Sequence, residues 1–291
     1  MKTGVITKGI GGFYYVDTGE AIYECRARGK FRLMDISPLV GDVVDIEVDD
    51  VSKKGYMLEI HTRSNEMVRP AIANVDQVMV VFAAKSPDIN MTLLQKFLIY
   101  AEQVGLNIVV CINKIDLDEN QDYKAVMEML QSIPYKVITT STKKLIGIDD
   151  LKLALKDKTT VFAGPSGAGK SSLLNLVQEG LMLKIGDLSK KIDRGTHTTR
   201  HAELINLNMG GRVADTPGFT SLELNNIEPE MLEELFPEFR KYKDCKFTRC
   251  LHDSEPQCGV KAALQDGKIS TMRYDYYLSL LKELKAIRRY K

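Results

Sequence analysis

The chain has 291 residues, a formal net charge of +1 and 27% charged residues. This length allows two or three domains with separate cores, and the near-neutral charge excludes a polycation that binds nucleic acid with its whole surface. No apolar run approaches the roughly 18 to 20 residues of a membrane-spanning helix, and the first residues do not read as a signal peptide. We therefore expect a cytoplasmic protein that has no membrane partner and keeps its cysteines reduced.

Residues 1–69 are predicted to form a small β-barrel. Five short stretches alternate apolar and polar residues, which buries one face of each strand: GVITKG, FYYVD, AIYECRAR, DVVDIEV and GYMLEIH. Five strands in about 65 residues fit an OB-like barrel. Residues 26–32, RARGKFR, mix basic side chains with Phe31. This mixture can pair with phosphates and stack on a base, although it is also typical of an ordinary solvated loop.

The pattern changes at about residue 70. VDQVMVVFAA and LNIVVCINK are continuous apolar runs, typical of strands that are buried on both faces of a parallel sheet. The stretch between them, NMTLLQKFLIYAEQVG, has helical spacing and ends at Gly105. Strand and helix patterns alternate in the same way up to GRVADT, so we expect a doubly wound α/β domain over residues 70–225.

The sequence GPSGAGKS at residues 164–171 fits the phosphate-loop pattern G-x-x-x-x-G-K-[ST]. It stands between a strand pattern and a helix pattern, where glycines let backbone N–H groups wrap phosphates and the helix N-terminus favours an anion. Lys170 is predicted to reach the β- and γ-phosphates and to act in catalysis, and Ser171 to bind magnesium. The predicted phosphate-binding residues are Gly164, Pro165, Ser166, Gly167, Ala168, Gly169, Lys170, Ser171 and Ser172.

Guanine is the base that the sequence predicts. Asn113, Lys114 and Asp116 form an NKID motif at the end of an apolar strand. A carboxylate at Asp116 can accept hydrogen bonds from N1–H and the amino group of guanine, a donor pair that adenine lacks. This motif is weak alone and strong beside a phosphate loop. Ser141, in the sequence STK, is predicted to lie in a second base-contacting loop.

Two further segments are predicted to sense the γ-phosphate. In DTPG, Asp215 is expected to orient magnesium through water and Gly218 to contact the γ-phosphate through its N–H. In RGTHTTR, Thr198 or Thr199 is the switch residue that binds magnesium and the γ-phosphate. We assign magnesium to Thr199, although the sequence does not distinguish the two threonines.

The motifs occur in a permuted order, because NKID and STK precede the phosphate loop, HTT and DTPG. Such permutation is tolerated when domain termini lie close together on the surface. It also leads DTPG directly into the C-terminal region, which nucleotide state is then expected to move as one body. Phe219 stands where many GTPases have a water-orienting Gln. Hydrolysis is therefore expected to be slow, with His197 either orienting water or serving as an ordinary loop residue.

Residues 226–291 are predicted to form a helical domain that holds zinc. Three thiols and an imidazole in the pattern C-x4-C-x-H-x5-C suit a closed, structural tetrahedral site; the ligands are Cys245, Cys250, His252 and Cys258. Chance clustering and redox thiols are the alternatives. Cys25 and Cys111, in apolar strand patterns, are expected to be core residues.

Taken together, the barrel pattern, the permuted NKID, GPSGAGKS, RGTHTTR and DTPGF motifs and the Cys/His cluster resemble the RsgA family of circularly permuted GTPases (the YjeQ/YloQ type) over essentially the whole chain. The resemblance implies a GTPase that is stimulated by the 30S ribosomal subunit, assists late maturation of that subunit, and contacts 16S rRNA through the barrel and the zinc domain. We expect a monomer with one structural zinc, and with magnesium bound alongside GTP or GDP. The alternative is a regulatory GTPase that acts on a protein effector.

Overall fold

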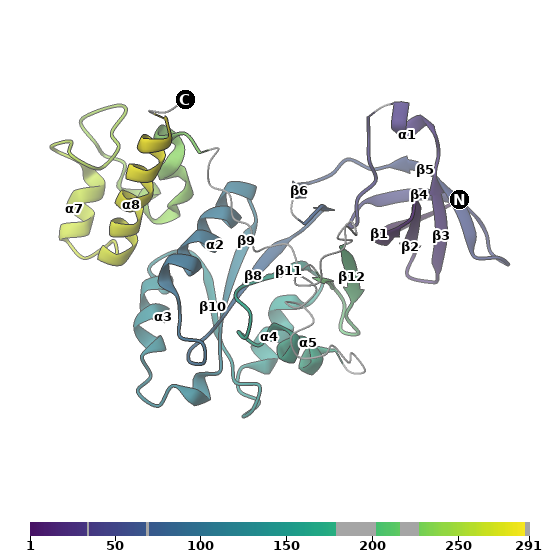
Figure 1. The fold of residues 1–291 in the computed structure, drawn as a ribbon, viewed down its shortest axis with the longest axis horizontal. Coiled ribbons are helices and arrows are strands. Elements are labelled where there is room, and N and C mark those ends of the chain that lie inside the picture. The colour runs from purple at the N-terminus through teal and green to yellow at the C-terminus, as the bar shows by residue number, and fades with distance from the viewer. Residues whose placement is uncertain (34, 68–69, 179–201, 216–226, 289–291) are drawn as a thin grey trace.

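The computed structural model describes residues 1–33, 35–67, 70–178, 202–215 and 227–288 (Figure 1). Its strands form one 11-stranded sheet with the order β10-β9-β8-β11-β13-β12-β1-β2-β3-β5-β4 and a two-stranded sheet of β6 and β7. Within the described residues, no helix is both long enough and apolar enough to span a membrane.

The N-terminal strands close into a barrel, because β1 pairs with both β2 and β4. The strands are β1 (Lys2–Ile10), β2 (Phe13–Asp17), β3 (Ile22–Ala27), β4 (Val43–Asp49) and β5 (Lys54–Ile60), with the short helix α1 (Lys30–Leu33) between β3 and β4. Strands β3 and β5 run parallel and the other neighbours antiparallel. This topology confirms the predicted five-stranded OB-like barrel.

The barrel core contains side chains from alternate strand positions, as the sequence pattern predicts. Ile6, Val16 and Tyr23 are fully buried there. Phe31 is also in this core, with 4% of its surface exposed. Its ring is therefore not free to stack on a base, and the prediction of stacking by Phe31 is wrong. Cys25 and Cys111 are buried core thiols, as expected.

The second part is a doubly wound α/β unit, as predicted. Its strands are β8 (Gln77–Ala83), β9 (Asn107–Asn113), β10 (Lys136–Thr139), β11 (Thr159–Ala163), β12 (Glu203–Asn206) and β13 (Arg212–Asp215). All neighbours are parallel except β12 and β13. Its helices are α2 (Met91–Val104), α3 (Tyr123–Gln131), α4 (Ile148–Leu155) and α5 (Lys170–Val177), with a 3-10 turn η1 (Ile115–Leu117).

The helices cover both faces of this sheet. Val80 and Phe82 of β8 lie in one core cluster with residues of α2 and α3, whereas Met79 and Val81 lie in another with residues of α4 and α5. Every residue of β8 is therefore buried, as expected for a strand between two helical layers. The short strands β6 (Glu66–Met67) and β7 (Ile72–Ala73) lie between the barrel and this unit.

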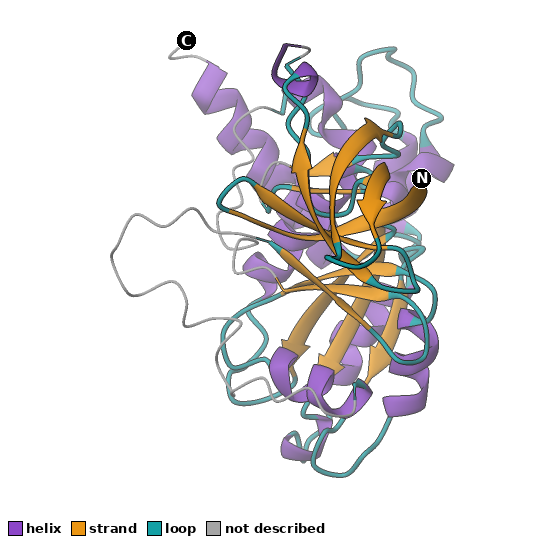
Figure 2. Ribbon diagram, turned by 90° about the vertical axis from the view of Figure 1, so that its right-hand side faces the viewer, coloured by secondary structure: helices purple, strands orange, loops and turns teal. Residues whose placement is uncertain are grey.

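The barrel and the α/β unit share one continuous sheet, since Lys8 of β1 pairs with Glu203 of β12. Figure 2 shows the strands of the barrel above those of the α/β unit.

The C-terminal part is helical, as predicted, and consists of η2 (Pro229–Leu235), η3 (Pro237–Tyr242), α7 (Gly259–Gln265) and α8 (Thr271–Arg288). Phe236, Phe239 and Tyr277 form its aromatic core, and Ile99 of α2 belongs to the same buried cluster. The C-terminal part therefore packs directly on a helix of the α/β unit.

Candidate nucleotide site and metal centre

The phosphate loop connects the buried strand β11 to helix α5, as its motif predicts. Two of its glycines have no room for a side chain. A Cβ on Gly164 (φ +131°) would lie 2.0 Å from the carbonyl oxygen of Val81, and a Cβ on Gly169 (φ +95°) would lie 2.2 Å from Nδ2 of Asn113. The loop therefore depends on glycine both for its conformation and for its close packing on neighbouring strands.

Lys170 points back across the phosphate loop. Its Nζ donates to the carbonyl oxygens of Gly164 at 2.7 Å and Pro165 at 2.8 Å. Burial lowers the pKa of Lys170 to about 8, so a nearby phosphate would favour its charged form. Ser171 follows in the first turn of α5 and is buried, beside the helix N-terminus that favours anions.

Asn113 joins the guanine-type motif to the phosphate loop. Its Nδ2 donates to the carbonyl oxygen of Ala168 at 2.9 Å, and its Oδ1 accepts from Oγ1 of Thr140 at 3.0 Å. Asn113, Thr140 and Ala168 are all buried. The sequence analysis did not identify Thr140, and its only signal is its position directly before Ser141.

Asp116 and Ser141 come together although 25 residues separate them in the sequence. The Ser141 hydroxyl donates to Oδ1 of Asp116 at 2.5 Å and accepts from the backbone N–H of Lys144 at 3.0 Å. Lys114 donates from Nζ to the carbonyl oxygen of Ser86 at 2.5 Å, a contact that no motif predicts. The bond from Ser141 orients the Asp116 carboxylate, and Asn113 of the same motif contacts the phosphate loop.

Of the two predicted switch segments, the structure describes only Asp215, the last residue of β13. Strand β13 ends at Asp215, and β12 begins at Glu203 directly opposite. Because β13 is parallel to β11, Asp215 lies at the edge of the sheet where β11 leads into the phosphate loop. His197, Thr198, Thr199, Gly218 and Phe219 fall outside the described residues, so their predicted roles remain predictions, as does the role of the Asp215 side chain.

The four predicted metal ligands converge in the C-terminal part. One donor atom from each of Cys245, Cys250, His252 and Cys258 lies within 4.8 Å of the others. The Cys245 and Cys258 sulfurs are 3.8 Å apart, and Nδ1 of His252 lies 3.6 and 3.2 Å from them. Sulfurs about 2.3 Å from a zinc ion in a tetrahedron stand about 3.8 Å apart. The cluster therefore has the composition and dimensions to hold such a metal ion.

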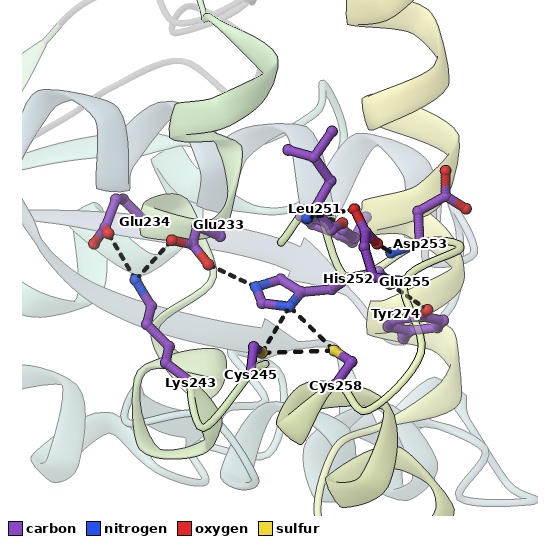
Figure 3. Close-up of polar contacts among 11 residues, drawn as sticks. Glu233, Glu234, Lys243, Cys245, Leu251, His252, Asp253, Glu255, Cys258 and Tyr274 are labelled. Atoms are coloured by element: carbon purple, nitrogen blue, oxygen red, sulfur yellow. Dashed lines mark hydrogen bonds and ion pairs between the residues drawn. The ribbon is translucent and has the colours of Figure 1, made fainter. Parts of the chain in front are cut away.

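A carboxylate that the sequence analysis missed completes this centre (Figure 3). Nε2 of His252 lies 2.6 Å from Oε2 of Glu233, on the side of the ring that faces away from the sulfurs. Lys243 holds the other carboxylate oxygen of Glu233 at 3.1 Å. A histidine metal ligand commonly donates its second N–H to a carboxylate, which fixes its tautomer and orientation. Glu233 lies 19 residues before His252, so ligand spacing gave no signal for it.

The surroundings of the cluster would favour a bound cation. Burial raises the pKa of the Cys258 thiol, which opposes formation of a thiolate unless a metal ion supplies positive charge. The hydroxyl of Tyr274 donates to the carbonyl oxygen of His252 at 2.5 Å, and His252 is itself 1% exposed. Cys250, His252 and Cys258 are buried and Cys245 is partly buried, so the cluster is largely enclosed by protein.

A phosphate loop, joined through Asn113 to a guanine-type carboxylate motif that precedes it in the chain, defines a circularly permuted P-loop GTPase. Comparisons with known proteins agree. The family model for the RsgA GTPase domain matches residues 60–225, and the model for the RsgA N-terminal domain matches residues 3–57. The chain belongs to the RsgA GTPase family and is therefore a GTP hydrolase.

Similar proteins span the full length of the chain. "Small ribosomal subunit biogenesis GTPase RsgA" of Alkaliphilus metalliredigens is 47% identical over 292 residues, covering 100% of both chains. The protein of the same name from Caldanaerobacter subterraneus is 48% identical, covering 99% of this chain and 98% of its own. Among solved structures, YjeQ from Thermotoga maritima has a TM-score of 0.85 at 39% identity, covering 97% of this chain and 98% of its own. YloQ, described as a circularly permuted GTPase, has a TM-score of 0.83 at 42% identity, covering 98% of this chain and 96% of its own.

Proposed function

We propose that this GTPase binds the small ribosomal subunit and assists its late maturation, and that the subunit stimulates GTP hydrolysis. The proposal is supported by the hydrogen bond from Asn113 to Ala168, which joins the motif of Asp116 to the phosphate loop of Lys170. These two groups suit guanine and phosphate respectively. Its partner is inferred from full-length relatives named for biogenesis of the small ribosomal subunit.

Within the nucleotide site, each residue has a proposed role. Asp116, oriented by Ser141, accepts hydrogen bonds from guanine. Lys170 and the N–H groups of the phosphate loop bind the phosphates. Magnesium, when it is bound with the nucleotide, would be held by the Ser171 hydroxyl and Thr199, and would neutralise charge that develops on the phosphates. We retain Asp215 and Gly218 as residues that respond to the γ-phosphate.

His197 is retained as the proposed water-orienting residue. Phe219 follows DTPG and has no group that can hydrogen-bond to water. Slow intrinsic turnover that rises on binding of the subunit is the behaviour expected of a site completed by its partner.

We propose zinc as the metal of the Cys/His centre, because three thiolates and one imidazole are a donor set that zinc prefers. The ion would fix residues 245–258 as a structural element. It would take no part in hydrolysis.

The proposed RNA partner is 16S rRNA, which the barrel and the C-terminal part would contact. Exposed basic side chains on these parts supply charge for phosphate contacts, among them Arg26, Arg28, Lys246 and Arg249. We also propose that the protein is cytoplasmic and monomeric, with an RNA-binding domain at 1–69, a GTPase domain at 70–225 and a zinc domain at 226–291.

GTP turnover with and without purified 30S subunits, across a range of salt concentrations, tests the proposal. We expect stimulation that falls steeply as salt rises, because phosphate contacts release counterions. Lys170→Ala is the matched control and should abolish turnover in both conditions. Absence of stimulation at every salt concentration would contradict the ribosomal role and favour a protein effector.

A further inference from the structure

Arg273, at the start of α8, is a buried arginine outside both sites described above. Its side chain is 0% exposed, and it forms a two-point ion pair with Glu238: Nε to Oε1 at 2.6 Å and Nη2 to Oε2 at 3.2 Å. The guanidinium also lies over the ring of Phe236, 4.4 Å from the centroid. Its position is therefore fixed on several sides by the C-terminal part.

The remaining edge of the guanidinium binds helix α2 of the GTPase unit. Nη1 of Arg273 donates to Oε1 of Gln95 at 3.1 Å, and Nε2 of Gln95 donates to the carbonyl oxygen of Met272 at 3.5 Å. Gln95 is 2% exposed. One turn further along α2, Ile99 is fully buried in the core of the C-terminal part. Gln95, through its hydrogen bonds, and Ile99, through its apolar packing, both bind α2 to the C-terminal part.

The N-terminal end of α2 leads directly to the nucleotide loops. Asn90 caps the helix by accepting a hydrogen bond from the N–H of Leu93 at 2.9 Å. Just before it, the carbonyl oxygen of Ser86 accepts from Nζ of Lys114 in the NKID motif. Pro87 Cδ lies 3.4 Å from the position that a Cβ on Gly167 would occupy in the phosphate loop. The segment 84–90 thus binds the NKID loop through Ser86 and lies next to the phosphate loop at Pro87.

These contacts lie close together along one helix. Gln95 is five residues after the cap Asn90, about 7.5 Å along the axis at 1.5 Å per residue. The other face of α2, which includes Leu94 and Leu98, is buried in the core beneath the sheet. A shift of α2 at Gln95 is therefore passed to segment 84–90 by a packed helix with little room to bend.

We propose that Arg273 is a positioning residue for the guanine-nucleotide site. By holding α2 through Gln95, it keeps the Ser86 carbonyl in place for Lys114 and keeps Pro87 against the phosphate loop. The C-terminal part then influences how long nucleotide stays bound. This inference rests on the proposed nucleotide site.

Dissociation of a fluorescent GDP from the full-length chain, chased with excess GDP at fixed magnesium, tests the proposal. Arg273→Gln and Gln95→Ala should each release GDP roughly three- to tenfold faster than the wild type. Arg273→Lys keeps the charge but loses the two-point geometry, and its release rate should fall between those of the wild type and Arg273→Gln.

Arg240→Ala is the matched control. Arg240 contacts Glu102 at the C-terminal end of α2, at 3.3 Å, and its side chain is 54% exposed. This variant disturbs the same two parts of the molecule far from segment 84–90, and its GDP release should equal that of the wild type. Thermal unfolding and metal content of each variant identify any general loss of structure.

Two results would overturn the inference. In the first, Gln95→Ala releases GDP at the wild-type rate, and Arg273→Gln either does the same or does not fold. The other is equal acceleration in Arg240→Ala. Failure of the wild-type chain to bind GDP is a separate result, because it would overturn the proposed nucleotide site itself.

Discussion

The GTPase unit meets each of its two neighbours through polar contacts that differ in their exposure to water. The barrel reaches β12 through Lys8 and Glu203, 3.0 Å apart with side chains 34% and 47% exposed, and through Asn206, which donates to Asp17 at 2.5 Å. The C-terminal part reaches α2 through fully buried groups, Arg273 and Ile99. The Lys8–Glu203 and Asn206–Asp17 contacts are open to water and salt, although apolar side chains of the barrel and of the α/β unit also share one buried cluster. The contacts of Arg273 and Ile99 are closed to both, and only the Arg240–Glu102 pair among the ion pairs described for this junction is exposed.

This difference indicates which neighbour can move. An exposed ion pair contributes about 0–1 kcal/mol, so the exposed polar contacts between β1 and β12 can change at little cost. Breaking a buried ion pair by removing one partner costs about 3–5 kcal/mol. The buried contact therefore opposes the expectation that nucleotide state moves the C-terminal part as one body relative to α2. We expect the exposed polar contacts between β1 and β12 to change more readily than the buried contacts with α2.

Of the changes considered, removal of the metal should produce the largest difference in stability between the C-terminal part and the barrel. Cys258→Ser deletes one ligand of a site whose zinc affinity can contribute about 10–16 kcal/mol to folding. We expect metal content to fall from about one ion per chain to near zero, and amide hydrogen exchange to increase over residues 229–242 but not over the barrel strands. Cys25→Ala, in the barrel core, should retain the metal. Full metal content in Cys258→Ser would contradict the proposed ligand set.

Breaking the buried ion pair should have the next largest effect. Glu238→Ala leaves the Arg273 guanidinium buried without its carboxylate, and should lower the free energy of unfolding by about 3–5 kcal/mol. Glu203→Ala, which removes the exposed partner of Lys8, should lower it by no more than about 1 kcal/mol. Urea denaturation of both variants measures the difference. Similar losses in the two variants would show that the junctions do not differ as described.

The contrast between the two junctions could not have been predicted from the sequence. Local motifs were informative where neighbouring residues act together, as in the phosphate loop, the NKID motif and the Cys/His spacing. Alternation also predicted the barrel, and continuous apolar runs predicted the buried parallel strands. These signals depend on periodicity and spacing within short stretches.

The missed residues act over long sequence separations. Glu233 reaches His252 across 19 positions, and Arg273 reaches Gln95 across 178. A lone Arg, Gln or Glu gives no local pattern, because these residues are usually solvated. Phe31 was misplaced for a related reason. Its basic neighbours suggested a surface segment, whereas the ring itself turns into the barrel core.

Added salt should weaken the exposed ion pair but not the buried one, and this difference should be smaller than the preceding effects. A double-mutant cycle of Lys8→Ala and Glu203→Ala should give a coupling of about 0.2–1 kcal/mol at low ionic strength. At about 1 M salt the Debye length falls to about 3 Å, and this coupling should vanish. A cycle of Arg273 and Glu238 should persist at the same salt concentration because water and ions do not reach that pair. Urea denaturation at both salt concentrations provides the measurement.

The smallest expected effect concerns Glu102, where the C-terminal part covers the end of α2. Its side chain is 16% exposed, and burial raises its pKa even though the Tyr135 hydroxyl at 3.0 Å and the Arg240 guanidinium both oppose the rise. A raised pKa in the folded state means that the wild type loses stability as pH increases from the unfolded value through the folded one. Glu102→Gln removes this titration. The variant should gain stability relative to the wild type as pH rises from 4 to 7, measured by urea midpoints at both pH values. A relative loss at pH 7 would instead mean that the contacts with Tyr135 and Arg240 outweigh burial, and that charge at this junction is stabilising.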